Sequence, residues 1–414
     1  MSALSPENWP FDLEFLPPPA YLVGGAVRDA LLGREVADLD LDFVLLSGAV
    51  KTARTIASYY KAGFVLLDAE RQIARVVFDG VTADFAEASG GSLQADLGRR
   101  DFTINAIAYD PILQEAIDPH GGQGDLKLGL MRMISRENLA DDPLRLLRGY
   151  RQAAQLGFAI EEKTRRAIAE LASLLERVAA ERIRTELGYL LNTPRGVSGL
   201  IEAWNVGLIS RWFPDADKGC DRLLNLDDMA SQLSKFDERL GAELGESVRE
   251  TLKMSRLAIA KLATLVSPEP ETAETQLLEL KYSRAEIRGV LAILRGLETI
   301  QNTPIPQLSI REQYFLFQTV GSFFAAFVAA GMAVGVPLEV FSPLVERYLT
   351  PKDAIAHPTP PVGGKVLMKE LGIPPSPVVG DLLLEVQLAQ AEGKIATPED
   401  AIAIAAQKLK EWNL

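Results

Sequence analysis

The chain has 414 residues, of which 48% are hydrophobic, and a formal net charge of −13. These values indicate a soluble globular protein of about two to four domains, and the negative charge argues against a protein that coats nucleic acid non-specifically, though not against one basic groove on an acidic surface. The single cysteine, Cys220, excludes a disulfide framework and fits a reducing cytosol, so we expect a cytoplasmic protein.

The histidine content and the apolar stretches exclude further classes. His120 and His357 are the only histidines, which argues against a histidine metal cluster and a Ser–His–Asp triad. Met1 to Pro19 carries acids and prolines instead of a basic n-region, so we expect no signal peptide. Residues 320–336 are uncharged but rich in alanine and glycine. Because a membrane span needs about 20 strongly apolar residues, we expect a buried helix there and no membrane association.

The first 140 residues or so mix strand and helix signals. Strand-like runs occur at Ala20–Val23, Leu39–Leu46, Gly63–Leu67, Ala74–Phe78 and Thr82–Phe85. A helical pattern at Ala49–Ala62 lies between them. This mixture predicts a head with a small mixed β-sheet.

From Pro143 onward the strand signals almost vanish. Helical apolar spacing recurs at Leu144–Leu156, Glu162–Leu175, Ala180–Leu191, Glu246–Leu265 and Arg284–Ile300. Prolines punctuate this part of the chain near residues 214, 268–270, 304–306 and 358–361. We therefore predict an α+β protein in which an all-helical neck, body and tail follow the head. The expected domains are a catalytic head at 1–141, a neck at 142–214, a body at 215–350 and a tail at 351–414.

The stretch YLVGGAVRDALLGREVADLDLDF, from Tyr21 to Phe43, carries the strongest chemical signal. A glycine pair, Gly24 and Gly25, follows a short apolar run and lets backbone N–H groups approach a phosphate closely. Asp38, Asp40 and Asp42 then alternate in a strand-like run, which puts all three carboxylates on one face. Acids in that arrangement repel one another unless a divalent metal lies between them. The pattern predicts a site for a nucleoside triphosphate and Mg²⁺.

Two arginines, an acid and an amide are concentrated in a second run, RRDFTINA. The planar guanidinium groups of Arg99 and Arg100 are suited to triphosphate oxygens, because each can bind two at once. Asp101 and Asn105 lie four residues apart, on one face if this run begins a helix, where they could orient those arginines. A surface ion-pair cluster is the alternative.

A third run, DDPLRLLRGYR, begins the first long helix. Asp142 is a natural N-cap, and proline is favoured at the first helical position that follows it. Arg145, Arg148 and Arg151 recur every three residues along one flank of this helix. From residue 143 to residue 186 there are nine Lys or Arg against six Asp or Glu, so the positive charge is concentrated beside the predicted triphosphate site.

Together these pieces, with DPHGGQGDL and ERIRTEL, resemble the class II tRNA nucleotidyltransferases, the CCA-adding family that includes bacterial poly(A) polymerases. The resemblance covers Tyr21 to Pro214 strongly, and the segment from Gly372 to Leu383 is similar to the family's tail domain. Residues 220–350 match only as a helical body.

The resemblance implies roles at matching positions. Counting from the glycine of LLGR, the catalytic metal carboxylates fall on Asp38 and Asp40, although the spacing leaves an Asp40/Asp42 pair open. Asp142 and Arg145 correspond to the pair that reads the incoming base, whereas Asp141 stands where the family usually has Glu. The implied nucleotide-binding residues are Gly24, Gly25, Arg28, Asp29, Arg99, Arg100, Asp101, Asn105, Asp142, Arg145, Arg148 and Arg151.

The base-reading role also follows from chemistry. Adenine and cytosine both present an amino donor beside a ring-nitrogen acceptor, whereas guanine and uracil reverse that order. One carboxylate and one guanidinium therefore select A and C without a nucleic acid template. The expected substrates are CTP, ATP or both and the tRNA 3′ end, with Mg²⁺ as cofactor.

Several activities stay open at this stage. The enzyme could add CC, A or CCA to tRNA, or synthesise poly(A), and a non-catalytic RNA-binding protein with this fold is the alternative from another class. Only a short segment joins Phe85 to Arg99. Full CCA-adding members tend to have a longer flexible segment there, so the short one resembles CC-adding enzymes.

Overall fold

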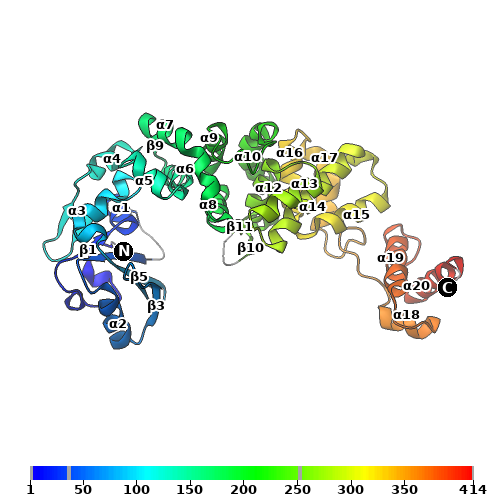
Figure 1. The fold of residues 1–414 in the computed structure, drawn as a ribbon. Helices are drawn as coiled ribbons and strands as arrows, with labels where there is room; N and C mark the ends of the chain where they lie inside the picture. The colour runs from blue at the N-terminus through cyan, green and yellow to red at the C-terminus, as the bar shows by residue number, and fades with distance from the viewer. Residues whose placement is uncertain (1–2, 35–38, 250–253, 413–414) are drawn as a thin grey trace. The chain divides into compact units, whose positions relative to one another are not determined.

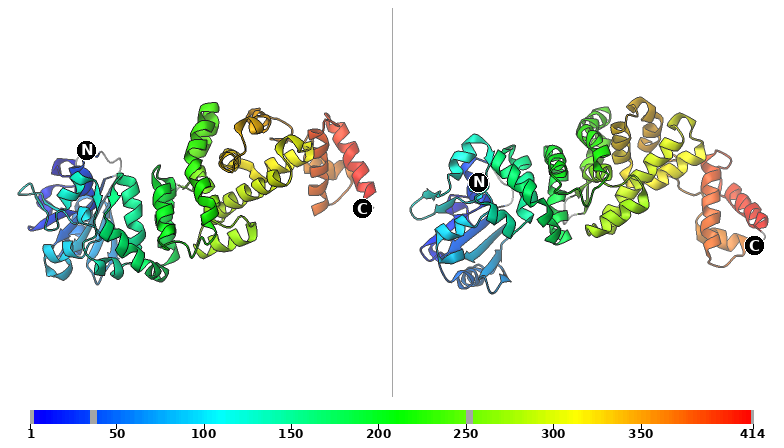
Figure 2. Two further views of the ribbon diagram at one scale, coloured as in Figure 1. Left: turned by 90° about the horizontal axis from the view of Figure 1, so that it is seen from above. Right: turned by 45° about the horizontal axis from the view of Figure 1, so that its top comes forward.

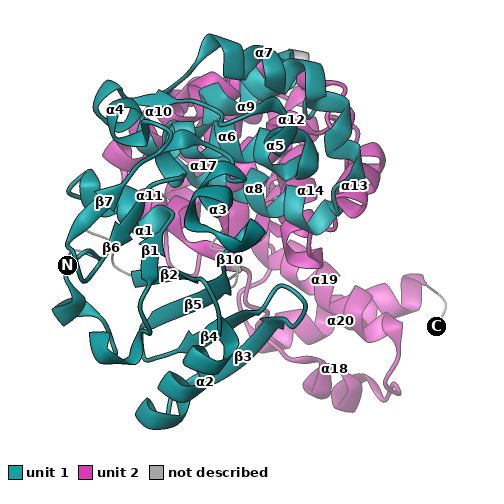
Figure 3. Cartoon of the chain, turned by 60° about the vertical axis from the view of Figure 1, so that its left-hand side comes forward, with its two compact units in different colours: residues 1–209 teal, residues 210–414 magenta. Residues whose placement is uncertain are grey.

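The structure is a computed structural model that describes residues 3–34, 39–249 and 254–412. The chain forms two compact units, Met1–Ile209 and Ser210–Leu414 (Figure 3). The predicted head and nearly all of the predicted neck belong to the first unit, and the predicted body and tail belong to the second. The finer division into four domains stays a prediction.

A seven-stranded mixed sheet forms the centre of the head, with strand order β3-β4-β5-β2-β1-β6-β7 (Figure 1). Strands β2 and β5 run parallel, and every other neighbouring pair in this sheet is antiparallel. The strands are β1 (Ala20–Val23), β2 (Leu39–Leu45), β3 (Gly63–Asp68), β4 (Ile73–Val77), β5 (Val81–Glu87), β6 (Ala108–Asp110) and β7 (Glu115–Ile117). The head helices are α1 (Gly25–Leu31), α2 (Ala49–Tyr60), α3 (Leu93–Gly98) and α4 (Gly122–Leu128). The small mixed sheet is thus confirmed.

The two faces of β2 differ because its side chains alternate. Phe43 is buried against Trp9 and Phe85, with ring centroids 4.9 and 5.3 Å away. Asp42 and Val44 point to the opposite face. There Val44 belongs to a small apolar cluster that includes Val23 of β1 and Leu97. One side of β2 therefore anchors the strand in the core, and the other presents carboxylates.

The glycine-rich DPHGGQGDL run closes the head. The Asp118 carboxylate accepts the N–H groups of Gly122 and Gln123, both at 2.8 Å, at the start of α4. A side chain at Gly122 would place its Cβ 2.2 Å from the carbonyl oxygen of Thr103. Asp125 accepts the Thr103 hydroxyl at 2.6 Å. These contacts hold the RRDFTINA run in place, so we assign the DPHGGQGDL loop a structural role.

The neck consists mainly of helices that follow the head in the chain. Helix α5 (Arg136–Asp141) ends the predicted head, and the neck helices are α6 (Leu144–Leu156), α7 (Glu162–Leu171), α8 (Ala180–Asn192) and α9 (Gly196–Asn205). Helix α6 packs against α8 and α9. Two short parallel strands, β8 (Leu130–Met131) and β9 (Ala159–Ile160), join the end of the head to the neck. The predicted bounds of the helix at 144–156 are confirmed.

In the part of the second unit that the structure describes, the regular elements are helices and one small β-ribbon. Its body helices are α10 (Cys220–Phe236), α11 (Glu238–Gly245), α12 (Arg256–Leu265), α13 (Pro270–Glu279), α14 (Arg284–Asn302), α15 (Ile310–Val320), α16 (Phe324–Ala333) and α17 (Leu338–Leu349). The predicted helix at 246–265 is wrong in its first half, because residues 247–249 pair with 254–255 as strands β10 (Ser247–Arg249) and β11 (Met254–Ser255). The helix begins only at Arg256, after Ser255 has capped it through the N–H of Ala258.

One stretch of the described chain, Ile310–Ala333, is long and apolar enough to cross a membrane, but 67% of its apolar window is buried inside the protein. Gly321, with φ +48°, interrupts it between α15 and α16. Helix α16 lies in the core of the body, where its residues from Phe324 to Met332 are buried. A core helix accounts for this stretch.

The tail helices are α18 (Gly364–Leu371), α19 (Pro377–Ala391) and α20 (Pro398–Glu411), and they pack on one another (Figure 2). Leu367, Leu382 and Val386 belong to a separate apolar core between them. Two polar contacts join α15 and α19: the Tyr314 hydroxyl donates to Gln387 at 2.9 Å, and Arg311 pairs with Glu385.

Candidate active site

The turn between β1 and α1 requires glycine. Gly24 has φ +76°, and a Cβ there would lie 3.2 Å from Asp42 Oδ2 and 3.3 Å from Arg100 Nη1. Both contacts are tighter than ordinary van der Waals packing, and the backbone conformation is one that other residues rarely adopt. The glycine therefore lets an acid and an arginine approach the same turn from two sides.

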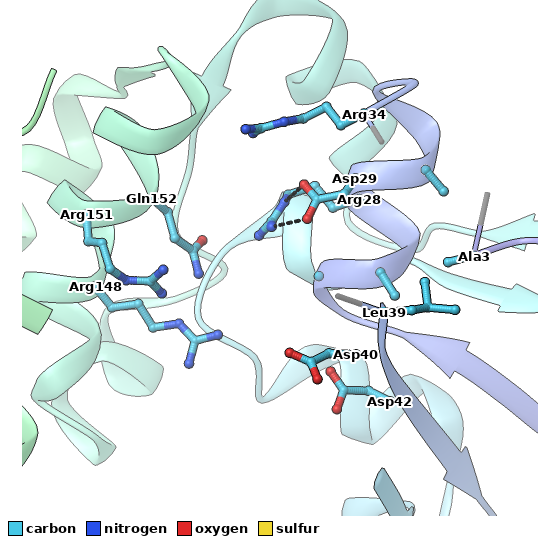
Figure 4. A pocket seen from close by; sticks show the side chains of 13 residues that line it. Ala3, Arg28, Asp29, Arg34, Leu39, Asp40, Asp42, Arg148, Arg151 and Gln152 are labelled. Carbon is cyan, nitrogen blue, oxygen red and sulfur yellow. Dashed lines mark hydrogen bonds and ion pairs between the residues drawn. The ribbon is translucent and has the colours of Figure 1, made fainter. Parts of the chain in front are cut away.

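Two of the three predicted carboxylates lie together in a cavity of about 270 Å³. Asp40 and Asp42 point the same way from β2, and Arg148 extends towards them from α6 (Figure 4). The Thr82 hydroxyl donates to Asp40 at 2.5 Å. Asp38 lies outside the described residues.

The Asp42 carboxyl is electrostatically crowded. Burial raises its pKa to about 6, and the neighbouring carboxylates of Asp84 and Asp40 also raise it, while Arg100 and Arg148 lower it. Asp84 lies beside Asp42 on the parallel strand β5. A divalent cation would relieve this repulsion, and oxygen donors are those that Mg²⁺ prefers.

The metal would need ligands beyond this pair. Within the described residues, no three His, Cys, Asp or Glu side chains are grouped so that they could hold a metal ion. Mg²⁺ in nucleotide enzymes is usually bound by one or two carboxylates together with substrate phosphates and water. Asp40 and Asp42 fit that pattern.

A partly buried hydrogen-bond network ties the head to the neck. Arg28 pairs with Asp29 through two hydrogen bonds of 3.0 and 2.8 Å and donates to Asn105 Oδ1 at 2.8 Å. The Asn105 amide donates to Asp101 at 2.9 Å and to Gln152 of α6 at 2.8 Å. Asp101 in turn pairs with Arg148 at 3.1 Å. Four head side chains, together with Gln152 of α6, thus hold the position of one neck arginine relative to the β2 carboxylates.

The RRDFTINA run differs from its sequence-based interpretation in one respect. Asp101 and Asn105 do contact arginines, but these are Arg148 and Arg28. Arg100 instead pairs with Asp96 of α3 at 3.0 Å and reaches Asn105 only through its backbone carbonyl oxygen, at 3.4 Å, and Arg99 is exposed. The reason is local backbone structure, since only residues 103–105 form a short 3₁₀ turn, which directs Asp101 and Asn105 towards α1 and α6.

The predicted base-reading pair lines a second cavity of about 980 Å³, together with Arg99 and Arg100. Arg145 Nη1 donates to the carbonyl oxygens of Arg99 at 2.8 Å and Asn138 at 2.9 Å. Asp142 pairs with Arg182 of α8 at 3.1 Å. Both side chains are therefore held in place before any nucleotide binds.

Asp142 is not an N-cap, contrary to the sequence-based expectation. It is the C-cap of α5, and Pro143 takes the cap position of α6. Asp141 is the last residue of α5; it is exposed and lines the same cavity.

The remaining predicted arginine, Arg151, lies in the first cavity. Its guanidinium pairs with Glu186 of α8, donates to Gln155 at 2.8 Å and covers the ring of Tyr189. Burial lowers the pKa of Arg151, although Glu186 raises it. Figure 4 shows Arg151 and Arg148 on one side of the cavity and the β2 carboxylates on the other.

Sequence reasoning missed four residues that organise these cavities: Asp84, Asn138, Gln152 and Arg182. Gln152 lies four residues after Arg148, so the helical spacing of the arginines could have revealed it. Asn138 donates to the carbonyl oxygens of Gly98 and Arg100, both at 2.8 Å. These contacts join segments 38 to 40 residues apart, and no local pattern indicates them.

Family models match most of the chain. Residues 20–132 match the poly(A) polymerase head domain, residues 157–220 the RNA- and SrmB-binding site of polymerase A, and residues 250–406 the tRNA nucleotidyltransferase domain 2. The first two models cover the two described cavities apart from the stretch around α6.

Two curated relatives and one solved structure show the extent of the similarity. The CC-adding tRNA nucleotidyltransferase of Synechocystis sp. is 46% identical over 402 residues, covering 96% of this chain and 95% of the relative. The CC-adding tRNA nucleotidyltransferase of Geobacter sulfurreducens is 33% identical over 94% of this chain and 92% of its own length. A CCA-adding enzyme solved with ATP shares the fold, with a TM-score of 0.69 at 21% identity over 94% of this chain and 91% of its own.

Proposed function

The chain belongs to the tRNA nucleotidyltransferase family, and we propose that it adds two cytidylates from CTP to the 3′ end of tRNA without a nucleic acid template. The observation that carries the proposal is the content of the two neighbouring cavities. A carboxylate pair on β2 lies beside one cavity that also holds Arg28, Arg148 and Arg151, and a fixed carboxylate–guanidinium pair lines the neighbouring one.

Asp142 and Arg145 would select the base. The carboxylate of Asp142 accepts the exocyclic amino group of cytosine, and a free N–H of Arg145 donates to the ring nitrogen. Because Arg145 Nη1 is occupied by two carbonyl oxygens, its other N–H groups are oriented for this contact. Uracil presents an oxygen where cytosine has the amino group, and that oxygen would face the carboxylate of Asp142.

The first cavity would hold the triphosphate. Backbone N–H groups at Gly24 and Gly25 can approach phosphate oxygens closely, and Arg28 and Arg148 supply guanidinium groups oriented by Asp29, Asn105 and Asp101. We propose Asp40 as a metal ligand together with Asp42 or Asp38. Mg²⁺ bound by these carboxylates would activate the RNA hydroxyl and stabilise charge on the α-phosphate and the leaving pyrophosphate.

The transfer itself exchanges one phosphorus–oxygen bond for another. The 3′-hydroxyl oxygen of the RNA attacks the α-phosphorus of CTP and loses its proton, and the bond to the β-phosphate oxygen breaks to release pyrophosphate. The role of the protein is to align the attacking and leaving oxygens and to neutralise the developing charge. The network from Arg28 to Arg148 would serve the second task, because it fixes two guanidinium groups beside the proposed triphosphate site.

The segment between β5 and Arg99 supports addition of CC alone. It is short and folded: residues 89–91 form a 3₁₀ turn, and α3 follows immediately. Asp96 of α3 accepts the N–H of Ser89 at 3.2 Å and pairs with Arg100, which binds the segment to the wall of the cleft. A segment restrained by these contacts has little freedom to move. It would therefore be unable to change the position of the base-reading pair to accept adenine after two cytidylates have been added.

The neck and the second unit would bind the RNA. The local excess of positive charge is in the neck, and we propose that the tRNA lies along the neck and the body and reaches the tail helices α18–α20. Since tRNA and CTP are cytoplasmic substrates and the single cysteine fits a reducing compartment, we also infer a cytoplasmic location.

Two RNA substrates test the proposal. The protein is incubated with Mg²⁺ and labelled CTP or labelled ATP, using either tRNA that ends before CCA or tRNA that ends in CC. We expect label only from CTP and only on the first RNA. Adenylate on the CC-ended tRNA would indicate an A-adding or CCA-adding enzyme, a long adenylate tract would indicate a poly(A) polymerase, and no label on either RNA would indicate a non-catalytic protein.

A further inference from the structure

We propose that Arg182 of α8 is the positioning residue that holds the Asp142 carboxylate in its base-reading orientation. This inference rests on the proposed function and extends it to a residue outside the base-reading pair. Arg182 would act through Asp142 and would not itself have to touch the base.

The two proposed base readers are held in different ways. Arg145 is fixed by carbonyl oxygens of Arg99 and Asn138, that is, by backbone that belongs to the head and to α5. Asp142 is in extended backbone between α5 and α6, with φ −131° and ψ 91°. A carboxylate in such a link can rotate about its side-chain bonds unless a partner restrains it.

Arg182 supplies that restraint. Its Nη2 donates to Asp142 Oδ2 at 3.1 Å, and both residues line the large cavity. One carboxylate oxygen is thereby occupied, which leaves Oδ1 to accept the amino group of a base. Helix α8 packs directly against α6, so Arg182 projects from a rigid element and not from a loop.

The energy of the pair favours a role in orientation over a role in stability. The side chains of Arg182 and Asp142 are 53% and 35% exposed, and exposed ion pairs contribute about 0–1 kcal/mol to folding. Replacing Arg182 should therefore leave the fold intact. The same replacement frees the Asp142 carboxylate to rotate, and a rotated carboxylate rejects uracil less well, because its repulsion of the uracil oxygen depends on direction.

The experiment compares Arg182→Ala, Arg182→Lys and a control, Arg166→Ala. Arg166 is also a neck arginine in an exposed ion pair, with Glu162 at 2.9 Å on α7, and it lines neither cavity. For each variant we measure the melting temperature, the dissociation constants of CTP and UTP by equilibrium dialysis, and kcat/KM for CTP and UTP on tRNA that ends before CCA.

For Arg182→Ala we expect an unchanged melting temperature and a loss of about tenfold in the preference for CTP over UTP, in binding and in kcat/KM, a loss within the range for one paired base edge. Arg182→Lys should recover most of the preference, since an ammonium group can still pair with the carboxylate. Arg166→Ala should keep the wild-type preference.

An Arg182→Ala protein that binds CTP and UTP in the wild-type ratio overturns the inference, and so does an equal loss for both nucleotides. Failure of the proposed function is a separate result: the wild-type protein would then add no cytidylate to tRNA, while the binding ratios would still decide the role of Arg182. A general weakening of the neck would lower the melting temperature of Arg182→Ala and would not be corrected by lysine.

Discussion

Replacing Asp42 with asparagine should produce a more stable protein, and an inactive one if Asp42 is the second metal ligand. The pKa of Asp42 rises from 3.8 to about 6, a shift of about 2 units, and each unit corresponds to about 1.36 kcal/mol. A folded-state pKa above the unfolded value means that the ionised carboxylate opposes folding at every pH above about 6. The neutral amide removes this repulsion, so without divalent cations at pH 8 the free energy of unfolding should increase by up to about 3 kcal/mol.

If Asp42 joins Asp40 as a metal ligand, its replacement should also reduce single-turnover transfer of cytidylate by at least about 10³-fold, because the cation supplies several kcal/mol of transition-state stabilisation. Urea denaturation in EDTA and rapid-quench assays in Mg²⁺ measure the two effects. The matched variants Asp38→Asn and Asp40→Asn decide which second carboxylate joins Asp40. A lower stability of Asp42→Asn in EDTA would refute the reasoning, and wild-type transfer by Asp42→Asn with total loss in Asp38→Asn would assign the pair to Asp38 and Asp40.

Four further outcomes follow from the site. Arg145→Ala should admit UTP and GTP, with a loss of about 1–3 kcal/mol in discrimination; equal slowing with all four triphosphates would mean that this residue does not read the base. Asn105→Ala should lower the free energy of unfolding by about 2–4 kcal/mol, since it removes three side-chain hydrogen bonds, two of them buried, and an unchanged urea midpoint would contradict the network. Below pH 6 the Mg²⁺ concentration for half-maximal rate should rise about tenfold per pH unit as Asp42 becomes protonated; Asp84→Asn, which removes one cause of the raised pKa, should move this rise to lower pH. Removing the chain after about residue 350 should weaken tRNA binding more than CTP binding, and equal tRNA affinity of the folded truncated protein at the same salt would exclude a role for the tail.

Local patterns in the sequence predicted most elements of the head and the neck. Alternating apolar residues predicted β2 to within one residue at its end, and helical spacing predicted α6 at its observed bounds. The failure at 246–265 also has a local cause. Apolar residues there are compatible with a helix throughout, but Ser255 caps a new helix through the N–H of Ala258, and residues 247–249 pair with 254–255 as strands.

The partners of the site residues could be predicted only in part. The residue types followed from chemistry, since paired acids and clustered arginines indicate a metal and phosphates. Their pairing depends on distant segments: Asn105 meets Arg28 across 77 residues, and Asp142 meets Arg182 across 40. Such contacts are set by how α1, α6 and α8 pack, which no local pattern specifies. The crowding of Asp42 by Asp84 likewise follows from the parallel pairing of β2 with β5.

The number of nucleotides added to one tRNA tests the central claim most directly. A tRNA that ends before CCA is incubated with the protein, Mg²⁺ and all four triphosphates until the reaction stops, and the mass of the RNA is then measured. Addition of two cytidylates and nothing more is the predicted result. A third addition of adenylate would contradict the restriction to CC, and an unchanged mass with the folded protein would contradict the assignment of the cleft as a nucleotidyltransferase site.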